Sequence, residues 1–227
     1  MHGKDIVTQS PLKQAVFIGD SITDSGRRND PSGHLGAGYV RRIDGIAHET
    51  GSPLRIINRG VGGDRVIDLQ QRWQSDCLDE RPDILTVLIG ANDTWRRYDS
   101  NMPTSADQFH DIYSEILSQA RTSLELDELV IMEPFLVPIT DQQQKWRDED
   151  LIDKIAAVRS LAVEHDATLI PLDELFTQQA QEKGPASVID DGVHPSAGGH
   201  QLIADTWWHT VGVRYGSIME TTGEPSA

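Results

Sequence analysis

The stretch Gln14-Ala-Val-Phe-Ile-Gly-Asp-Ser-Ile-Thr-Asp24 joins a short aliphatic run to a polar segment that starts at a glycine. Short apolar runs bounded by glycine and polar residues are typical of strands that are buried on both faces. Four further runs of this kind follow, at Leu54 to Asn58, Ile84 to Ile89, Leu129 to Met132 and Thr168 to Pro171. Together with Gln14 to Ile18 they predict five strands.

Segments with helical spacing separate these strands. The clearest runs from Ala106 to Leu126, where apolar residues recur every three or four positions. A second stripe runs from Leu151 to Ala162, and shorter ones cover Val66 to Trp73 and Leu202 to Trp208. This alternation predicts an α/β fold, a three-layer α/β/α sandwich around a five-stranded parallel sheet.

No internal repeat or low-complexity linker divides the chain. We therefore expect a single domain over residues 1–227, with its core at about 14–213 and a polar tail after about Gly216. Of the 227 residues, 37% are hydrophobic, which is enough to bury a sizeable core without disulfides. Cys77 is the one cysteine, so we expect a packed thiol in a protein of a reducing compartment.

Charge and hydropathy limit the partners. The chain has 36 acidic and 20 basic residues, a formal net charge of −16, which opposes binding to nucleic acid and to anionic membranes. Residues 1–13 lack the apolar stretch of a secretory signal, and no run of about 18 apolar residues occurs elsewhere. The sequence therefore predicts a cytoplasmic protein that binds neither nucleic acid nor membranes.

Four short segments carry polar residues in predicted loops. They are Gly19 to Asp24, Asn58 to Asp64, Gly90 to Asp93 and Asp191 to Pro195. The first three follow predicted strands directly, and the fourth precedes the last predicted helix. Because parallel α/β sheets bind ligands beyond the carboxyl ends of their strands, we expect the four segments to meet at one edge of the sheet.

The residue types in these segments suit attack on an ester. A serine hydroxyl such as that of Ser21 becomes a good nucleophile once a base takes its proton, and the imidazole of His194 can act as that base near neutral pH. Asp191 lies three residues before His194, so its carboxylate can orient the imidazole and stabilise the imidazolium. The backbone N–H groups of Ser21 and Gly63 and the side-chain amide of Asn92 are candidate donors to an oxyanion.

In the order, spacing and context of these segments, the chain resembles the SGNH hydrolases, also called GDSL esterases, over about Ala15 to Trp208. The resemblance implies a flavodoxin-like SGNH hydrolase fold and a serine esterase that forms an acyl-enzyme without a cofactor or metal. It places the family's nucleophile, two oxyanion donors, base and orienting acid on Ser21, Gly63, Asn92, His194 and Asp191, respectively. The first segment reads Gly-Asp-Ser-Ile where the family has Gly-Asp-Ser-Leu, which exchanges one aliphatic residue for another.

Within that family the chain is similar to carbohydrate acetyl esterases, especially intracellular bacterial enzymes that deacetylate xylo-oligosaccharides. The segments that carry this likeness are Phe17 to Asp24, Gly38 to Val40, Asp68-Leu69 with Arg72-Trp73, Ile89 to Asp99, Glu133 to Phe135, and His194 to His200. The likeness implies an acetylated sugar as the small-molecule ester substrate, and a homo-oligomer.

Sugar rings favour aromatic platforms with polar neighbours. Trp95, Arg96 and Tyr98 follow Asn92 within one predicted loop, so we predict that they bind the substrate. The alternative is that they pack this loop against the core or a subunit interface, where such residues are also common. Trp207 and Trp208 lie in a predicted helix and are expected to be structural.

Other functions remain open. The same fold and residues could serve a thioesterase, a lysophospholipase or a general carboxylesterase, and a catalytically silent carbohydrate-binding protein could keep the segments. A metal-dependent phosphoesterase using Asp20, Asp93, Asp191 and His194 would need a ligand cluster, and these residues lack a recognisable ligand spacing. Asp20 and Asp93 are instead expected to brace the loops through backbone hydrogen bonds.

Overall fold

The structure, a computed structural model, describes residues 11–216 and contains the predicted five-stranded parallel sheet. The strand order is β2-β1-β3-β4-β5. The strands are β1 (Lys13–Gly19), β2 (Leu54–Gly60), β3 (Ile84–Leu88), β4 (Glu128–Met132) and β5 (Thr168–Ile170). All five lie within two residues of the predicted bounds. The predicted polar tail after Gly216 lies outside the described residues.

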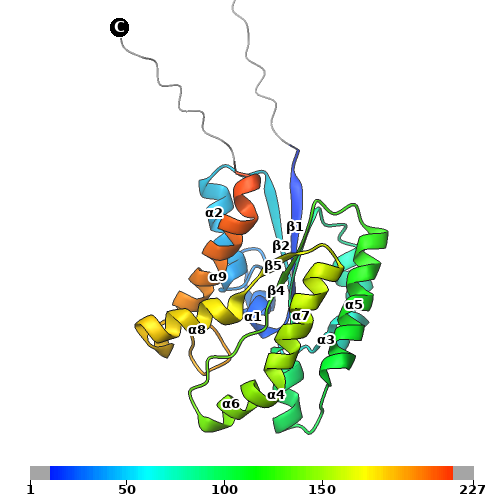
Figure 1. Cartoon of the computed structure of the whole chain (residues 1–227). Helices are drawn as coiled ribbons and strands as arrows, with labels where there is room; N and C mark the ends of the chain where they lie inside the picture. The colour runs from blue at the N-terminus through cyan, green and yellow to red at the C-terminus, as the bar shows by residue number, and fades with distance from the viewer. Residues whose placement is uncertain (1–10, 217–227) are drawn as a thin grey trace, which may run out of the picture.

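Helices cover both faces of the sheet, as predicted (Figure 1). The helices are α1 (Ser21–Asp24), α2 (Tyr39–Glu49), α3 (Val66–Gln71), α4 (Ala91–Asp99), α5 (Ala106–Ser123), α6 (Asp141–Trp146), α7 (Ile152–Glu164), α8 (Leu172–Lys183) and α9 (Ala197–Thr210). Helices α2, α8 and α9 pack on one face, and α3, α5 and α7 on the other. Short 3₁₀ turns, η1 (Arg27–Asn29), η4 (Pro185–Ser187) and η5 (Gly212–Arg214), and π-helical turns, η2 (Gln74–Leu78) and η3 (Arg147–Leu151), complete the chain.

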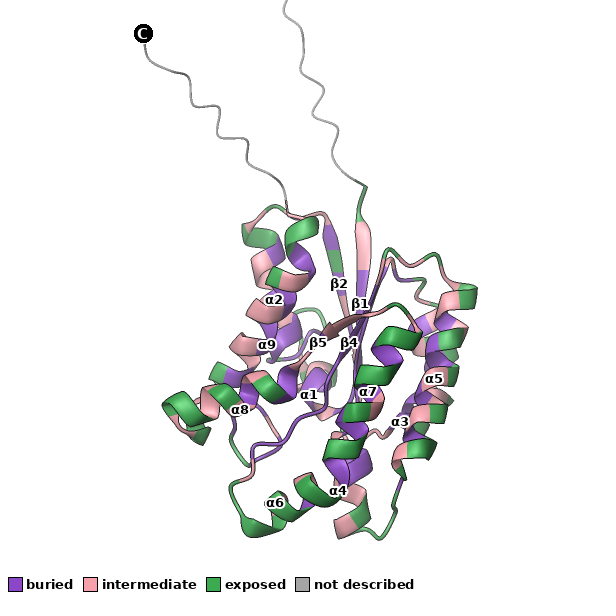
Figure 2. Ribbon diagram, viewed as in Figure 1, coloured by how far each residue is buried: buried purple, intermediate pink, exposed green. Residues whose placement is uncertain are grey.

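Residues of β1 explain why the central strands read as continuous apolar runs. Ala15 and Phe17 belong to the core on the α2/α9 side, whereas Val16 and Ile18 belong to the core on the α5 side, and all four are fully buried. Successive side chains of a strand point to opposite faces, so a strand covered on both sides has no polar face. Figure 2 shows this burial along the sheet and on the inward sides of the helices.

Helix ends account for the differences from the predicted bounds. The helix predicted to reach Leu126 ends at Ser123, because Leu124 already has an extended backbone. Its start is fixed by a capping box in which Ser105 accepts from the Gln108 N–H. The last predicted helix is longer than expected, since Ser196 caps α9 at Ala197. Within α9, Trp207 is structural as predicted, with its indole N–H donating to Thr86 Oγ1 at 3.0 Å.

The carboxyl ends of the strands lie at the lower end of the view in Figure 1, where α1 and α4 begin. Helix α6 and the π-helical turn η3 lie at the same end. The described chain begins and ends at the opposite side, beside the amino end of β1. None of the helices in residues 11–216 has the length and hydropathy needed to cross a membrane.

Candidate active site

Ser21 lies just beyond the carboxyl end of β1, because a tight turn leads from β1 directly into α1. A Cβ atom on Gly19 would lie 2.1 Å from the Leu88 carbonyl oxygen, so only glycine fits between β1 and β3 at this point. Asp20 then caps α1, because its Oδ1 accepts the Ile22 N–H at 3.0 Å. Ser21 is therefore the first residue of a helix, with its side chain beyond the strand end.

Ser21, His194 and Asp191 form one chain of hydrogen bonds. Ser21 Oγ lies 3.1 Å from His194 Nε2, and His194 Nδ1 lies 2.7 Å from Asp191 Oδ2. The His194 side chain remains 39% exposed. Partial burial raises the pKa of Asp191, but hydrogen bonds from His194 and from the Val193 N–H outweigh it and hold that pKa below its ordinary value. Asp191 is thus kept as a carboxylate beside the imidazole.

The three predicted oxyanion donors differ in whether the protein itself occupies them. The N–H groups of Ser21 and Gly63 have no hydrogen-bond partner within residues 11–216. Gly63 has φ +91°, a conformation that favours glycine. Its neighbour Gly62 is next to the serine, since a Cβ there would lie 3.8 Å from Ser21 Cβ. The Asn92 amide donates to the Asp64 carbonyl at 3.1 Å, which leaves its second N–H available.

Two buried acids brace these loops, as predicted. Asp93 carboxylate oxygens accept the Val66 N–H at 3.1 and 3.3 Å, which ties α4 to the start of α3. Burial raises the pKa of Asp93 to about 6 and that of Asp20 to about 7, although hydrogen bonds from backbone N–H groups oppose both shifts. No group of three or more His, Cys, Asp or Glu in the described part of the chain is arranged to hold a metal ion.

Trp95, Arg96 and Tyr98 lie on helix α4, so their predicted placement in a loop is wrong. Trp95 is the one of the three whose ring is near His194, at 6.0 Å between ring centroids. Arg96 pairs with Asp99 and lies 5.6 Å from the Trp95 ring centroid. Tyr98 stacks on Trp146 of α6 at 5.6 Å, in the packing role that the alternative interpretation gave it.

Gln143 and Trp146 of α6 were not predicted to be part of the site. Gln143 Nε2 donates to the Asp191 carbonyl at 2.6 Å, while its Oε1 accepts the Ile139 N–H at 2.9 Å. Trp146 packs against Trp95 at 5.8 Å and belongs to an apolar cluster with Val193. Nothing in the sequence indicates these contacts, because about 50 residues separate α6 from the loop it touches.

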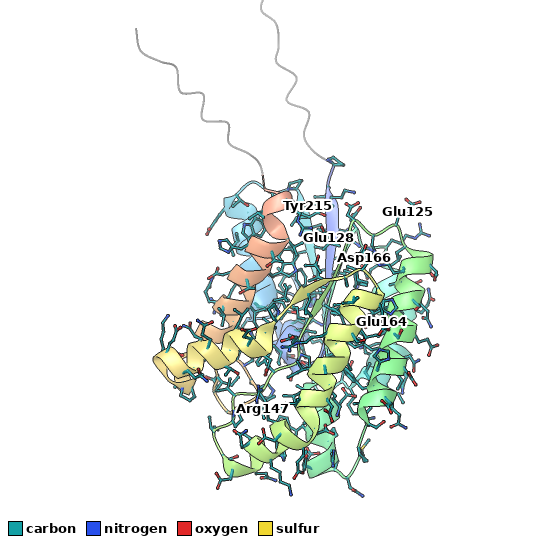
Figure 3. The ribbon with its side chains drawn as sticks, viewed as in Figure 1. Glu125, Glu128, Arg147, Glu164, Asp166 and Tyr215 are labelled. Atoms are coloured by element: carbon teal, nitrogen blue, oxygen red, sulfur yellow. The ribbon has the colours of Figure 1, made fainter. Side chains whose placement is uncertain are left out.

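The segment after α6 is held in place from the other side. Arg147, the first residue of η3, donates to both carboxylate oxygens of Asp173 at the start of α8 and to the Leu136 carbonyl. Figure 3 shows Arg147 at the end of the molecule that carries the strand ends, far from Glu128 and Tyr215. Arg147 therefore fixes the segment that follows α6, the helix whose Gln143 contacts the Asp191–His194 loop.

The family comparison agrees with this geometry. The model of the GDSL-like Lipase/Acylhydrolase family matches residues 17–202. The chain belongs to this family. It is therefore an ester hydrolase, as the sequence predicts.

This esterase is similar, along nearly its whole length, to an acetylxylan esterase and to solved hydrolase structures. It is 30% identical over 211 residues to an acetylxylan esterase of Geobacillus stearothermophilus, covering 89% of this chain and 95% of the relative. The crystal structure of Axe2, an acetylxylan esterase of the same organism, superposes with a TM-score of 0.79 at 26% identity, covering 92% and 98% of the two chains. LAE5, an alpha/beta hydrolase from the metagenome of Lake Arreo in Spain, gives a TM-score of 0.78 at 25% identity, covering 90% and 97%. The predicted SGNH hydrolase fold is confirmed by the match to Axe2.

Proposed function

We propose that this esterase removes small acyl groups, in particular acetyl, from sugars such as xylo-oligosaccharides, through an acyl-enzyme on Ser21. The observation that carries the proposal is the hydrogen-bonded chain from Ser21 Oγ through His194 to Asp191, together with the N–H groups of Ser21 and Gly63 that have no partner within residues 11–216. Such a chain supplies a nucleophile and base, and the N–H groups supply donors for an oxyanion.

In acylation, Ser21 Oγ attacks the ester carbonyl carbon while His194 Nε2 accepts the hydroxyl proton. The carbonyl oxygen becomes an oxyanion that accepts hydrogen bonds from the N–H groups of Ser21 and Gly63 and from the Asn92 amide. The intermediate collapses as the C–O bond to the sugar breaks, and His194 returns the proton to the leaving sugar hydroxyl. Asp191 stabilises the imidazolium between these two transfers.

Deacylation repeats the same steps with water as the nucleophile. His194 takes a proton from the water, the oxygen of the water bonds to the acyl carbon, and Ser21 leaves with the proton from His194. Acetate is released and the serine is restored. All of the proton transfers use the Nε2 atom that lies 3.1 Å from Ser21 Oγ.

The acyl and sugar preferences are supported more indirectly. The relative that matches 89% of this chain is named an acetylxylan esterase, and that name motivates the choice of acetylated xylo-oligosaccharides as substrate. The Trp95 ring beside His194 offers a flat apolar surface where a sugar ring could stack. Arg96, on the same helix, is proposed to bind the sugar hydroxyls, and Tyr98, which stacks on the buried Trp146, is proposed to contact the sugar with its exposed part.

One panel of substrates tests the proposal. We expect faster acyl release from acetylated xylo-oligosaccharides than from butyryl, thioester or lysophospholipid substrates. In Ser21→Ala, kcat/KM should fall by about a thousandfold or more for every substrate. Ser118→Ala removes an exposed hydroxyl of α5 and serves as the control that keeps full activity. Preference for long acyl chains would contradict the acetyl assignment, and substantial turnover by a folded Ser21→Ala would contradict the serine mechanism.

A further inference from the structure

A groove along the outer edge of the sheet holds a fifth of the Lys and Arg residues of this acidic chain. Strand β2 is one of the two edge strands of the sheet, and a hollow of about 700 Å³ lies beside it. Four arginines line this groove, out of 20 basic residues in the whole chain. They are Arg27, Arg28, Arg55 and Arg59. Glu80 is the one carboxylate among the described residues of the lining.

The arginines come from two elements. Arg55 and Arg59 are four residues apart on β2, so their side chains leave the strand on the same side. Arg27 and Arg28 belong to η1 and line the same hollow. Strand β2 and η1 therefore each contribute two arginines to the lining of one hollow.

Their pairing within the protein is incomplete. Arg59 binds Glu80 through one terminal nitrogen, but its Nε is buried and has no partner in the described part of the chain. Arg55 is exposed, and its side chain makes no hydrogen bond or ion pair with any residue in 11–216. Arg28 pairs with Asp24 at 3.6 Å. Burial lowers the pKa of Arg27, Asp24 opposes that effect, and the nearby guanidinium of Arg59 lowers it further.

We propose that this groove binds an oxyanion, a carboxylate or phosphate group carried by a small ligand. Guanidinium groups stay protonated in proteins, so their mutual repulsion is relieved by an anion rather than by loss of a proton. Carboxylate and phosphate both present paired oxygens that match the fork of N–H donors on arginine. Arg55 is the exposed guanidinium of this groove that makes no hydrogen bond or ion pair within residues 11–216, so it is the donor available to such a ligand.

The groove adjoins the ester site through a short series of contacts. Asp24 Oδ2, which pairs with Arg28, also accepts the Gly62 N–H at 3.1 Å. Arg27 Nε donates to the Gly60 carbonyl at 2.5 Å. The oxyanion therefore has two possible sources. One is an acidic sugar unit of an oligosaccharide bound at the ester site, and the other is a free phosphate ion; the experiment below distinguishes them.

The test is calorimetric titration of the full chain with inorganic phosphate and, separately, with an oligosaccharide of uronic acid units. It is run at about 20 mM ionic strength, where screening is weak. We expect saturable binding to one site, weakened at least about fivefold in Arg55→Gln through loss of a charge-assisted hydrogen bond. Lys183→Gln removes one positive charge from the exposed end of α8 and should bind as the wild type does. The ligand that binds more tightly identifies the source.

Three results would overturn the proposal. They are the absence of saturable binding of both ligands, unchanged binding in Arg55→Gln, and equal weakening in Arg55→Gln and Lys183→Gln. Because Arg55 contacts no other side chain by hydrogen bond or ion pair within residues 11–216, its variant should fold normally, and circular dichroism checks this. The readout is binding rather than hydrolysis, so a failure of the proposed esterase mechanism would leave this result unaffected.

Discussion

Asp20, directly before Ser21, couples the folding of the site to pH. Its carboxyl is fully buried, which raises its pKa to about 7, against the opposing effects of the Ile22 N–H and of the positive charge that His194 can carry. Asp93 and Asp64 add smaller effects that raise it further. In the unfolded chain the same carboxyl ionises near pH 4. Between these two pH values the folded protein therefore holds a proton that the unfolded chain has lost.

The stability that this proton confers is present at low pH and lost as pH rises through 7. From pH 6 to pH 8 the contribution of Asp20 to the free energy of unfolding should fall by about 1 kcal/mol. Asp20→Asn keeps an acceptor for the Ile22 N–H and cannot ionise, so it should lose less stability over this range. Urea unfolding of both proteins at pH 6 and pH 8 measures the difference. Equal losses in the two proteins would show that Asp20 does not carry this proton.

Helix α6 and the Asp191–His194 loop form one unit, although they are distant in sequence. The Val137 N–H donates to the Gly192 carbonyl at 3.0 Å, and Gln143 donates to the Asp191 carbonyl. Gly192 has φ +95°, and a Cβ there would lie 2.5 Å from the Gln143 amide. These two hydrogen bonds hold the backbone of the loop at Asp191 and Gly192. Gln143 acts in this arrangement as a positioning residue for His194.

Replacing Gln143 should lower kcat and leave KM nearly unchanged. Gln143→Glu keeps the acceptor for the Ile139 N–H but cannot donate to Asp191, and Gln143→Ala loses both contacts. We expect kcat to fall about tenfold in each, because small misplacement of a catalytic group raises the barrier by about 1.4 kcal/mol. Steady-state kinetics on p-nitrophenyl acetate, alongside thermal unfolding, measure both effects.

The control is Gln144→Ala on the same helix, whose side chain bonds to Asp148 within residues 11–216 and not to the loop. It should keep the kcat of the wild type. A Gln143 variant that loses thermal stability but turns over at the normal rate when folded would show that Gln143 is structural and does not position His194.

Strands were predictable and helix α4 was not, for the same physical reason. The buried side chains of β1 and β3 are mostly apolar, so each strand appears in the sequence as a short apolar run. The buried residues of α4 are the polar Asn92, Asp93 and Thr94 in its first turn, which are 4%, 0% and 2% exposed. The apolar positions of α4, Ala91, Trp95 and Tyr98, are few and only partly buried, so they give a weak helical pattern. The candidate site residues could be found from their order along the chain, whereas the support from α6 depends on packing that only the fold brings about.

The two ends of the sheet have different tasks. The carboxyl end carries Ser21, Asn92 and the His194 loop. At the amino end, contacts hold the last described residues to the rest of the fold, for example the hydrogen bond that Ser52 Oγ donates to the Tyr215 carbonyl at 2.8 Å. Lys13 lies at that end too, 2.9 Å from both Asp83 and Asp127. This separation lets loops vary at one end while the other end keeps the strands in register.

The excess of negative charge acts on the stability of the entire fold. With a net charge of −16, repulsion between carboxylates opposes the compact state at pH 7. Surface ion pairs of the kind seen at Lys145–Glu149 contribute about 0–1 kcal/mol each, so screening them costs little. Raising NaCl from about 0.05 M to about 0.5 M should therefore increase Tm by a few degrees at pH 7.5. Near the isoelectric point of about 4.7 the increase should largely disappear. A Tm that falls with NaCl at pH 7.5 would mean that ion pairs outweigh the net repulsion.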